Sequence, residues 1–467
     1  MTARSSGELL AGWGRACPSA ARVVTPQTAK DVTAFLSEPG PHLPRGLGRS
    51  YGDAAQCAGG TVIDCTALDS IVELDHIESR VKVDAGCSLD SLLRVIVPQG
   101  FFVPVTPGTR YVTVGGAIAS DVHGKNHHRD GTISAHVERL ELATPTARLE
   151  CGPEEEAELF WATAGGMGLT GVITDATLRL VPIETSRMLV DTERTADLDA
   201  CMARMAETDA QHRYSVAWVD SLARGRQLGR SVITVGDHAG ITDLSDNLRD
   251  DPLEFSPRQL LNVPVTPPIS LLNPMTVAAF NEAWYRRAPR QRTGELQRIS
   301  TFFHPLDGIG NWNVLYGPRG FTQYQFVVPF GSESVVRRVL ERLSSARMAS
   351  FLAVLKRFGA AGKGHLSFPI TGWTFALDLP LGTAGLAVVL DELDEIVANA
   401  GGRVYLSKDG RVRPEILHAM YPRIGEWDEV RRSVDPQGVL VSDLSRRLRL
   451  TGPGSRQGPR VFGGRRP

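Results

Sequence analysis

The sequence has no long hydrophobic run. Of its 467 residues 42% are hydrophobic, yet no apolar stretch approaches the roughly 18 residues that a transmembrane helix needs. The N-terminus also lacks the core of a signal peptide, because only Leu9-Leu10-Ala11 precede Gly12 and Trp13. These absences predict a protein that is cytoplasmic or bound peripherally to the plasma membrane.

An excess of charge is absent too, since 51 Lys and Arg residues face 52 Asp and Glu residues. The balance implies no large basic surface, so we do not expect nucleic acid as a partner. Cysteine is scarce, and its six copies lie in the first half of the chain without the spacing of a metal site or a disulfide framework. We expect all of them to be reduced and individually buried: Cys17, Cys57, Cys65, Cys87, Cys151 and Cys201.

Glycine, in contrast, is concentrated in three loops of the first third of the chain. The first glycine loop is Arg45–Asp53 (RGLGRSYGD), the second is Pro107–His128 (PGTRYVTVGGAIASDVHGKNHH) and the third is Ala164–Gly171 (AGGMGLTG). Glycine has no Cβ, so backbone N–H groups can approach a ligand, and successive amides can bind a pyrophosphate. Three such loops indicate a bound dinucleotide.

Neither of the two common nucleotide-binding motifs fits these loops. The glycines of the first loop are spaced G-x-G-x-x-x-G, prolines precede them where a buried Rossmann strand should run, and no helical pattern follows. The Gly-Lys-Ser/Thr triplet of a P-loop does not occur in the sequence. We therefore expect a different dinucleotide site, in which several short loops share the pyrophosphate.

The chain is too long for one ordinary core, so we expect two domains. Hydrophobic periodicity predicts that they are of the α+β class. In the first part we expect helices over 27–36, 88–97 and 154–164, strands over 60–64, 80–86 and 137–143, and a strand pair over 169–181. Thr28 and Ser88 are the predicted caps of the first two helices. Pro182 marks the first boundary.

The second part predicts an antiparallel sheet. Strands over 323–328, 353–358 and 373–379 alternate with helices over 332–346 and 384–398, and further helices are expected up to residue 447. Six prolines from Pro252 to Pro274 indicate an irregular loop, whose leucines could touch lipid or simply cover the core. The tail 451–467 holds four arginines, no acid and little to bury, so we expect disorder there.

The three glycine loops resemble the FAD-binding domain of the vanillyl-alcohol-oxidase flavoprotein superfamily. From about Gly12 to Leu448 the chain is similar, more closely, to the family of decaprenylphosphoryl-β-D-ribose 2′-oxidases, the flavin subunits of the actinobacterial epimerase that makes the arabinose donor for cell-wall arabinan. Besides the first glycine loop, the closer resemblance is carried by these motifs, in order: Thr113–Ile118, His123–His128, Leu228–Arg230, Trp284–Arg286, His304–Asp307, Gln323–Phe326, Leu366–Ile370 and His418–Arg423.

The resemblance implies a two-domain α+β flavoprotein with an FAD-binding domain over 1–185, a substrate domain with an antiparallel sheet over 186–401, and a segment over 402–450 that returns to the FAD domain. Many relatives attach flavin covalently through a histidine directly after the last glycine of the first loop. Asp53 stands there, so we expect non-covalent FAD. The implied cofactor-binding residues are Gly46, Gly48, Arg49, Ser50, Tyr51, Gly52, Gly108, Thr113, Gly115, Gly116, His123, Gly124, Lys125, His128, Ile173 and Tyr405.

The implied catalytic residues are Lys408, His123, Gln325 and Tyr51, and the implied substrate-binding residues are Trp218, Lys356, Gln325, Phe303, Thr374 and Ala376. Oxidation of a secondary alcohol by flavin requires a group that accepts the hydroxyl proton or stabilises the alkoxide. Lys408 is the leading candidate, because a desolvated lysine can lose its proton near neutral pH. Alternatively, Lys408 is a solvated residue in a turn. His123 could be the base instead, or it could be a structural histidine that hydrogen-bonds the loop.

Two other readings remain open for charged residues. Lys356 and Arg357 suit a substrate phosphate, or else they are outward residues at a strand edge. The histidines at 123, 127 and 128 with Asp121 lack the spacing of a metal motif, so we expect no metal. Ala376, Thr374 and Phe303 replace the cysteine, asparagine and tyrosine of the relatives, which reshapes the predicted pocket.

The resemblance implies oxidation of the 2′-hydroxyl of decaprenylphosphoryl-β-D-ribofuranose to the 2′-keto sugar, with a separate NADH-dependent keto-reductase completing the epimerisation. One alternative is an FAD-dependent oxidase of soluble alditols or aldonolactones. A second is an inactive flavin-binding paralogue. A lipid-linked substrate predicts contact with the membrane through the proline-rich loop, whereas a soluble polyol does not.

Overall fold

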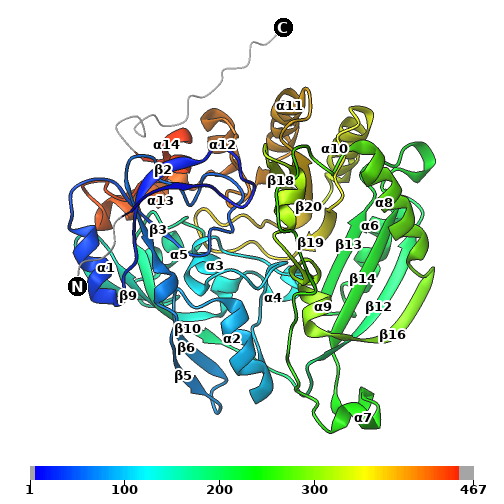
Figure 1. Cartoon of the computed structure of the whole chain (residues 1–467), viewed down its shortest axis with the longest axis horizontal. Helices are drawn as coiled ribbons and strands as arrows, with labels where there is room; N and C mark the ends of the chain where they lie inside the picture. The colour runs from blue at the N-terminus through cyan, green and yellow to red at the C-terminus, as the bar shows by residue number, and fades with distance from the viewer. Residues whose placement is uncertain (1–5, 452–467) are drawn as a thin grey trace.

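A computed structural model describes residues 6–451, so nearly all of the predicted tail lies outside the described residues. The N-terminal and C-terminal segments lie together on one side, and the green and yellow middle of the chain forms the other (Figure 1). The first sheet has the order β1-β2-β4-β3, with β2, β4 and β3 parallel. Its strands are β1 (Ser6–Leu10), β2 (Ser19–Val24), β3 (His42–Arg45) and β4 (Thr61–Asp64).

Helix α1 (Ala29–Leu36) connects β2 to β3 and begins where predicted. The hydroxyl of Thr28 accepts the N–H of Asp31 at 3.2 Å, and the carboxylate of Asp31 accepts the N–H of Thr28 in return. This reciprocal pair satisfies donors that the first turn leaves free. Val32 and Leu36 are buried beneath the helix.

The second sheet is antiparallel in the order β5-β6-β10-β8-β9. Its strands are β5 (Ile71–Asp75), β6 (Arg80–Asp84), β8 (Val137–Ala143), β9 (Arg148–Cys151) and β10 (Val172–Arg179). The predicted strand pair over 169–181 is wrong. A bulge between Ile173 and Asp175 bends β10 without ending it, and only β11 (Val181–Pro182) follows, paired with β7 (Phe101–Phe102).

Helices accompany this sheet. They are α2 (Leu89–Ile96), α3 (Val114–Ala119), α4 (His127–Asp130) and α5 (Ala157–Thr163). Ser88 caps α2 as predicted. The periodicity missed α3, because two adjacent glycines have low helix propensity. Tertiary packing overrides that propensity, since Val114, Ala117 and Ile118 are buried and Thr113 caps the helix.

The middle of the chain forms an eight-stranded antiparallel sheet in the order β16-β12-β14-β13-β19-β20-β18-β21, as predicted. The strands are β12 (Arg187–Thr195), β13 (Tyr214–Val219), β14 (Ser231–His238), β16 (Gln291–Arg298), β18 (Phe321–Pro329), β19 (Ala353–Phe358), β20 (Gly372–Pro380) and β21 (Arg403–Val404). The helices of this part are α6 (Leu198–Thr208), α7 (Asp246–Arg249), α8 (Pro274–Arg287), α9 (Ile299–Phe303), α10 (Glu333–Ser345) and α11 (Leu386–Asn399).

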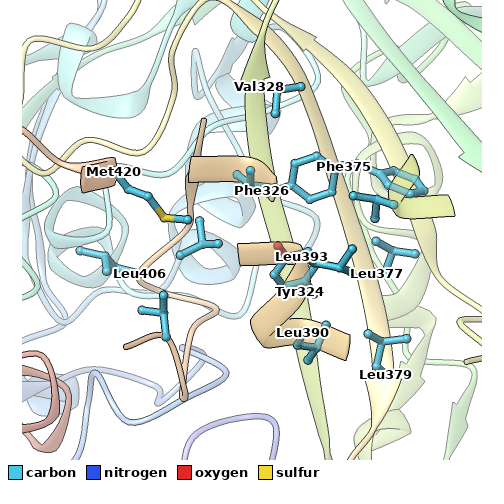
Figure 2. Packing of buried hydrophobic residues seen from close by; sticks show 14 of the residues in the cluster. Tyr324, Phe326, Val328, Phe375, Leu377, Leu379, Leu390, Leu393, Leu406 and Met420 are labelled. Carbon is cyan, nitrogen blue, oxygen red and sulfur yellow. The ribbon is translucent and has the colours of Figure 1, made fainter. Parts of the chain in front are cut away.

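One face of the large sheet forms the main core. Alternate residues of a strand point to opposite faces, so Phe326 on β18 and Phe375 on β20 share a face. Figure 2 shows these rings gathered with Leu390 and Leu393 of α11. Gln325, between Tyr324 and Phe326, belongs to the opposite face. The sheet is therefore apolar on the side of its helices and polar on the other.

The C-terminal segment contains α12 (Pro414–Met420), α13 (Ile424–Val434) and α14 (Asp443–Arg447). Its first strand, β21, pairs with β18, so the segment begins in the large sheet. It then reaches the N-terminal part, where the indole of Trp427 donates to the carbonyl of Ala162 at 3.1 Å and the N–H of His42 donates to the carbonyl of Val439 at 2.7 Å. The boundaries at residues 185 and 401 stay predictions.

The prediction that all six cysteines are buried is wrong for Cys17. The five other cysteines are buried, all six are free thiols, and Cys17 is exposed.

The segment from Pro252 to Pro274 is irregular apart from β15 (Leu261–Asn262), which pairs with β17 (Ile309–Gly310). Short 3₁₀ helices lie at Cys65–Ala67, Val97–Gln99, Ile133–His136, Gly225–Gln227, Ile241–Asp243, Pro305–Gly308 and Trp312–Tyr316. Within residues 6–451, each helix falls short of the length and apolarity needed to cross a bilayer.

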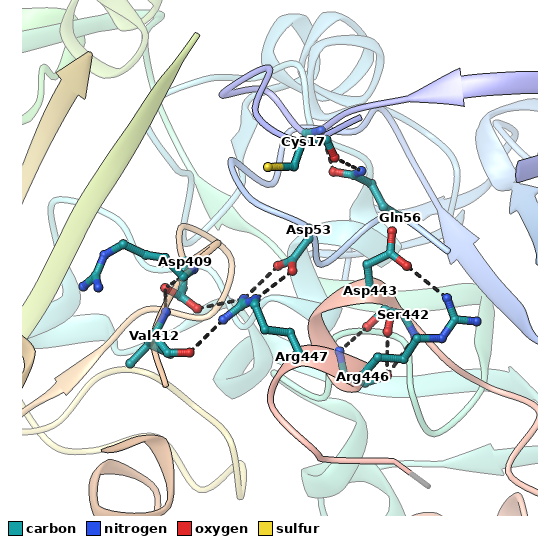
Figure 3. A network of polar contacts seen from close by, with 12 residues as sticks. Cys17, Asp53, Gln56, Asp409, Val412, Ser442, Asp443, Arg446 and Arg447 are labelled. Carbon is teal, nitrogen blue, oxygen red and sulfur yellow. Dashed lines mark hydrogen bonds and ion pairs between the residues drawn. The ribbon is translucent and has the colours of Figure 1, made fainter. Parts of the chain in front are cut away.

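Arg447 ties the end of the chain to the first glycine loop (Figure 3). Its guanidinium makes two hydrogen bonds of 2.8 Å to the carboxylate of Asp53 and lies 2.9 Å from a carboxylate oxygen of Asp409. The two carboxylates raise the pKa of Arg447 above its ordinary value despite its burial. Asp53 therefore anchors the C-terminal segment.

Replacing this arginine tests the anchor. Arg447→Met leaves two largely buried carboxylates without a counter-charge, so we expect the free energy of unfolding to fall by about 3 kcal/mol in urea titrations. Arg449→Met is the matched control, because the Arg449 pair with Glu415 is exposed, with side chains 66% and 60% accessible. It should cost less than about 0.5 kcal/mol. Equal losses in the two variants would contradict the assignment.

Candidate functional site

The three glycine loops meet at α3. A Cβ on Gly46 would lie 2.2 Å from the hydroxyl oxygen of Thr113, so only glycine allows the first loop to touch the second. The N–H of Gly165 donates to the carbonyl of Ile118 at 3.1 Å, and the N–H of Met167 donates to that of Ala119 at 2.9 Å. The predicted convergence of these loops is thus held by direct contacts with one short helix.

The first loop offers hydrogen-bond donors for a ligand. Among the described residues, no acceptor binds the backbone N–H of Gly48, Arg49 or Ser50. Gly48 has φ +62°, which turns the chain so that neighbouring amides can converge. The Arg49 guanidinium lies 3.8 Å from the ring centroid of Trp13 and adds a fixed positive charge beside them. Free amides next to a cation fit the pyrophosphate of a dinucleotide.

Several glycines serve the fold more directly than a ligand. A Cβ on Gly52 would lie 1.8 Å from the carbonyl oxygen of Asp409, one on Gly115 would lie 2.9 Å from Ala85, and one on Gly124 would lie 2.5 Å from the Asn126 amide oxygen. Gly108, by contrast, has no protein atom within 4 Å of its Cβ position. Gly108 is exposed, so its surroundings do not require glycine, whereas glycine at the other three positions permits close approach of the chain to itself.

The polar face of the large sheet aligns the predicted substrate residues. Strand register places Trp218 opposite Val354, Val354 opposite Ala376, and Ala376 opposite Gln325, so four adjacent strands contribute one continuous row. The next row contains Lys356 opposite Thr374. Four of the predicted substrate-side residues, far apart in sequence, thus share one face of the sheet next to Lys356.

His123 of the second glycine loop lies against this face. Its Nε2 is 3.0 Å from the side-chain nitrogen of Gln325, and its Nδ1 is 3.3 Å from Nζ of Lys356. The ring is buried against Tyr405 and Phe358, with centroids 5.6 and 4.7 Å away. Burial, assisted by the charge of Lys356, holds the pKa of His123 well below its ordinary value. His123 is therefore neutral at neutral pH.

Lys408 is not a solvated turn residue. Its ammonium lies 3.8 Å from the ring centroid of Tyr51, in a cation–π contact, and the N–H of Tyr51 donates to the carbonyl of Ser407 at 2.8 Å. Burial lowers the pKa of Lys408, whereas the negative charge of Asp378 opposes that shift. A lysine in this environment can exchange a proton near neutral pH.

The sequence did not lead us to predict Asp378, Gln323 or Tyr316 as site residues. The Asp378 carboxylate is fully buried, accepts a hydrogen bond from Gln323 at 2.5 Å, and lies near the hydroxyl of Tyr316. Burial raises its pKa. A signal was present, because period-2 alternation places residue 378 on the same face of its strand as Thr374 and Ala376.

Other predicted residues lie outside this cluster. Phe303 packs in the core with Phe102 and Tyr214, at centroid distances of 5.0 and 4.8 Å. His128 bonds through Nε2 to the carbonyl of His212 at 3.0 Å, and Ile173 is buried in β10. None of these three side chains contacts His123, Gln325 or Lys408 in a bond or ring contact among the described residues.

Two further basic residues have partners within the protein. Lys125 donates to the carbonyl of Phe302 and lies 4.2 Å from that ring, and burial lowers its pKa to about 7. Arg357 bonds to Asp209 at 2.9 Å, so it is not available as a fork for a substrate phosphate. The strand-edge alternative is wrong as well, because β19 lies between β13 and β20.

The three clustered histidines have different partners. His127 accepts the N–H of Gly359 at 3.2 Å through Nδ1, whereas Asp121 is buried and bonds to Ser134 and Ser367. Among the described residues, His, Cys, Asp and Glu side chains form no group of three that could hold a metal ion. The remaining predicted residue, Tyr405, donates its hydroxyl to the carbonyl of Ser120 at 2.7 Å.

Contact between the first two glycine loops can be tested at Gly46. In Gly46→Ala the new methyl group would overlap Thr113, which cannot move away because its hydroxyl caps α3 through the N–H of Gly116. We expect the Kd for flavin to rise at least about ten-fold, measured by the flavin retained on gel filtration. Gly425→Ala, where a Cβ meets no atom within 4 Å, is the matched control and should retain flavin fully.

Comparison with known proteins adds to this geometry. The family model "FAD binding domain" matches residues 20–152, and the model "D-arabinono-1,4-lactone oxidase" matches residues 387–448. The first match covers the strands from β2 to β9 together with the first two glycine loops. It confirms the predicted FAD cofactor and the flavoprotein fold.

Individual relatives are more specific than the family models, and one of them matches nearly the whole chain. Decaprenylphosphoryl-beta-D-ribose oxidase of Mycolicibacterium smegmatis is 44% identical over 451 residues, which cover 94% of this chain and 97% of that protein. A Streptomyces coelicolor protein named "Uncharacterized protein in mprA 5'region" is 42% identical over 371 residues, which cover 78% of this chain and all of that protein. L-gulonolactone oxidase of Bos taurus is 31% identical over 138 residues, only 29% of this chain and 31% of that protein. The chain therefore belongs to the decaprenylphosphoryl-β-D-ribose oxidase family of FAD-dependent oxidoreductases.

Proposed function

We propose that this enzyme oxidises the 2′-hydroxyl of decaprenylphosphoryl-β-D-ribofuranose to the 2′-keto sugar. The observation that carries the proposal is the shared polar face of the large sheet, which aligns Trp218, Ala376 and Gln325 beside Lys356 and presents them to His123 of the FAD-binding part. The name of the Mycolicibacterium relative supports this substrate. A separate NADH-dependent keto-reductase would then complete the epimerisation.

The chain's own residues supply the proton chemistry. The glycine loops would hold FAD, which would supply the hydride acceptor for the sugar carbon. Lys408 accepts the hydroxyl proton, since burial beside Tyr51 makes its neutral form accessible. His123 and Gln325 orient the sugar, and Lys356 meets the phosphate as a point charge. Asp53 bonds to Arg447 and carries no imidazole, which supports non-covalent FAD.

Anaerobic reduction of the flavin tests the substrate and the base together. Polyprenylphosphoryl-ribose should bleach the visible absorbance of the oxidised enzyme. Lys408→Ala should slow this bleaching at least about 100-fold, because a general base contributes that much or more. The exposed Lys363 provides the control Lys363→Ala, which should bleach at the normal rate. Bleaching by xylitol or an aldonolactone, but not by the lipid-linked sugar, would instead support the soluble-substrate alternative.

We further propose that residues 258–292 contact the membrane that holds the lipid substrate. Of the sixteen exposed large hydrophobic side chains among residues 6–451, eight lie there: Leu260, Leu261, Val265, Ile269, Leu271, Met275, Phe280 and Trp284. The segment has five arginines and one glutamate, so its net charge of +4 complements an anionic lipid surface. A cavity of about 330 Å³ beside it is lined by Ile269, Leu272, Arg319 and Arg347.

Vesicle binding tests this surface. Ile269 and Met275 are 71% and 83% exposed, and inserting each side chain into lipid contributes about 1.5 kcal/mol or more. Ile269→Ser and Met275→Ser should therefore each weaken sedimentation with phosphatidylglycerol vesicles about ten-fold. Ile77→Ser, at a residue 91% exposed in the turn after β5, should leave it unchanged. Uniform binding by all variants would rule out this segment as the contact.

A further inference from the structure

Thr374 lies at one end of a buried chain of hydrogen bonds in the site. Its hydroxyl donates to the carbonyl of Phe326 at 2.9 Å. A hydroxyl has one proton, so the oxygen of Thr374 can then only accept. The Gln325 side-chain nitrogen lies 3.3 Å from that oxygen and donates to it. Thr374 therefore determines which end of the Gln325 amide faces it.

The amide orientation in turn determines the tautomer of His123. The second N–H of Gln325 points to Nε2 of His123 at 3.0 Å, so Nε2 must accept. A neutral imidazole carries a single ring proton, which must then lie on Nδ1. Burial keeps the ring neutral by lowering its pKa. The Nδ1–H of His123 is therefore the hydrogen-bond donor that faces Lys356.

Lys356 closes the chain only in its uncharged form. Its Nζ lies 3.3 Å from Nδ1 of His123, and an N–H can bond only to a lone pair, which an ammonium group lacks. Burial lowers the pKa of Lys356 to about 8. The titratable groups whose charges couple to it are His123, His127, Lys125 and Lys408, all basic. In the described part of the chain no carboxylate forms an ion pair with it.

We propose that Thr374 is a positioning residue that acts through Gln325 and His123 to favour the uncharged amine of Lys356 over its ammonium form. When an anionic group of the substrate arrives, an uncharged Lys356 takes one proton from solvent, its contact with Nδ1–H is released, and the ammonium pairs with the anion. The identity of that anion as a sugar phosphate rests on the proposed function. The hydrogen-bond chain from Thr374 to Lys356 does not depend on the proposed function.

Three substitutions separate this role from simple packing. Thr374→Val keeps the shape and removes the hydroxyl, so the amide can turn over, Nε2 can carry the proton, and the Nδ1 lone pair can accept from a charged Lys356. Thr374→Ser keeps the hydroxyl. Thr163→Val is the matched control, because Thr163 is also buried and its hydroxyl donates to a carbonyl, that of Leu159, at 2.8 Å in α5.

The direct measurement is the reactivity of Lys356 toward acetic anhydride as a function of pH, read by mass spectrometry of the holoenzyme. We expect Thr374→Val to raise the midpoint by about one pH unit. Thr374→Ser and Thr163→Val should retain the midpoint of the unmodified enzyme. An unchanged midpoint in Thr374→Val with full flavin content would overturn the proposal. If that variant loses flavin, Gln325→Leu provides the same test, since it also frees the His123 tautomer.

Measuring proton uptake on binding tests the role of Thr374 separately from the identity of the substrate. At pH 8.5 in weak buffer, binding of polyprenylphosphoryl-ribose should take up protons in the unmodified enzyme and fewer in Thr374→Val. If the labelling midpoint shifts while the lipid-linked sugar fails to bind, the hydrogen-bond chain stands and the proposed substrate is wrong. Binding with equal proton uptake in both proteins would overturn the role of Thr374.

Discussion

The two-residue alternation of β18, β19 and β20 is the constraint on which the rest of the structure depends. Phe326 and Phe375 face the helices, whereas Gln325 and Thr374, their neighbours in sequence, face the FAD-binding part. A shift of the register by one residue would bury the polar set in the core and expose the aromatic set. The same packing that stabilises the sheet therefore fixes the direction of the predicted substrate-side side chains on it.

Burial of basic groups without carboxylate partners sets the chemistry of the site. Removing a lysine from water disfavours its charged form, and the neighbouring positive charges act in the same direction. Lys356 and Lys125 therefore have lowered pKa values, and His123 is neutral. Asp378 is the exception among the neighbours of Lys408, because its charge opposes the effect of burial. A site of this kind is prepared for an anionic ligand and for proton exchange near neutral pH.

The glycine loops show how one residue type can serve two purposes. Gly48 lies among backbone amides that are open to a ligand, whereas Gly46 and Gly52 allow the chain to touch Thr113 and Asp409. The contact at Gly52 belongs to the region that Arg447 anchors through Asp53. The first glycine loop and the C-terminal segment thus depend on each other, although Asp53 and Arg447 are 394 positions apart in sequence.

The sequence by itself determined the elements whose patterns are local. Thr28 and Ser88 cap their helices as predicted, the succession of strands and helices in the second part predicted the antiparallel sheet, and the motifs of the glycine loops identify the FAD-binding family. Only the tertiary structure decided which distant groups meet. The contact of His123 with Gln325 joins residues 202 positions apart, and the ion pair of Arg357 with Asp209 removes a predicted phosphate ligand. Periodicity is set by near neighbours along the chain, whereas such contacts depend on strand register and packing, which no local pattern encodes.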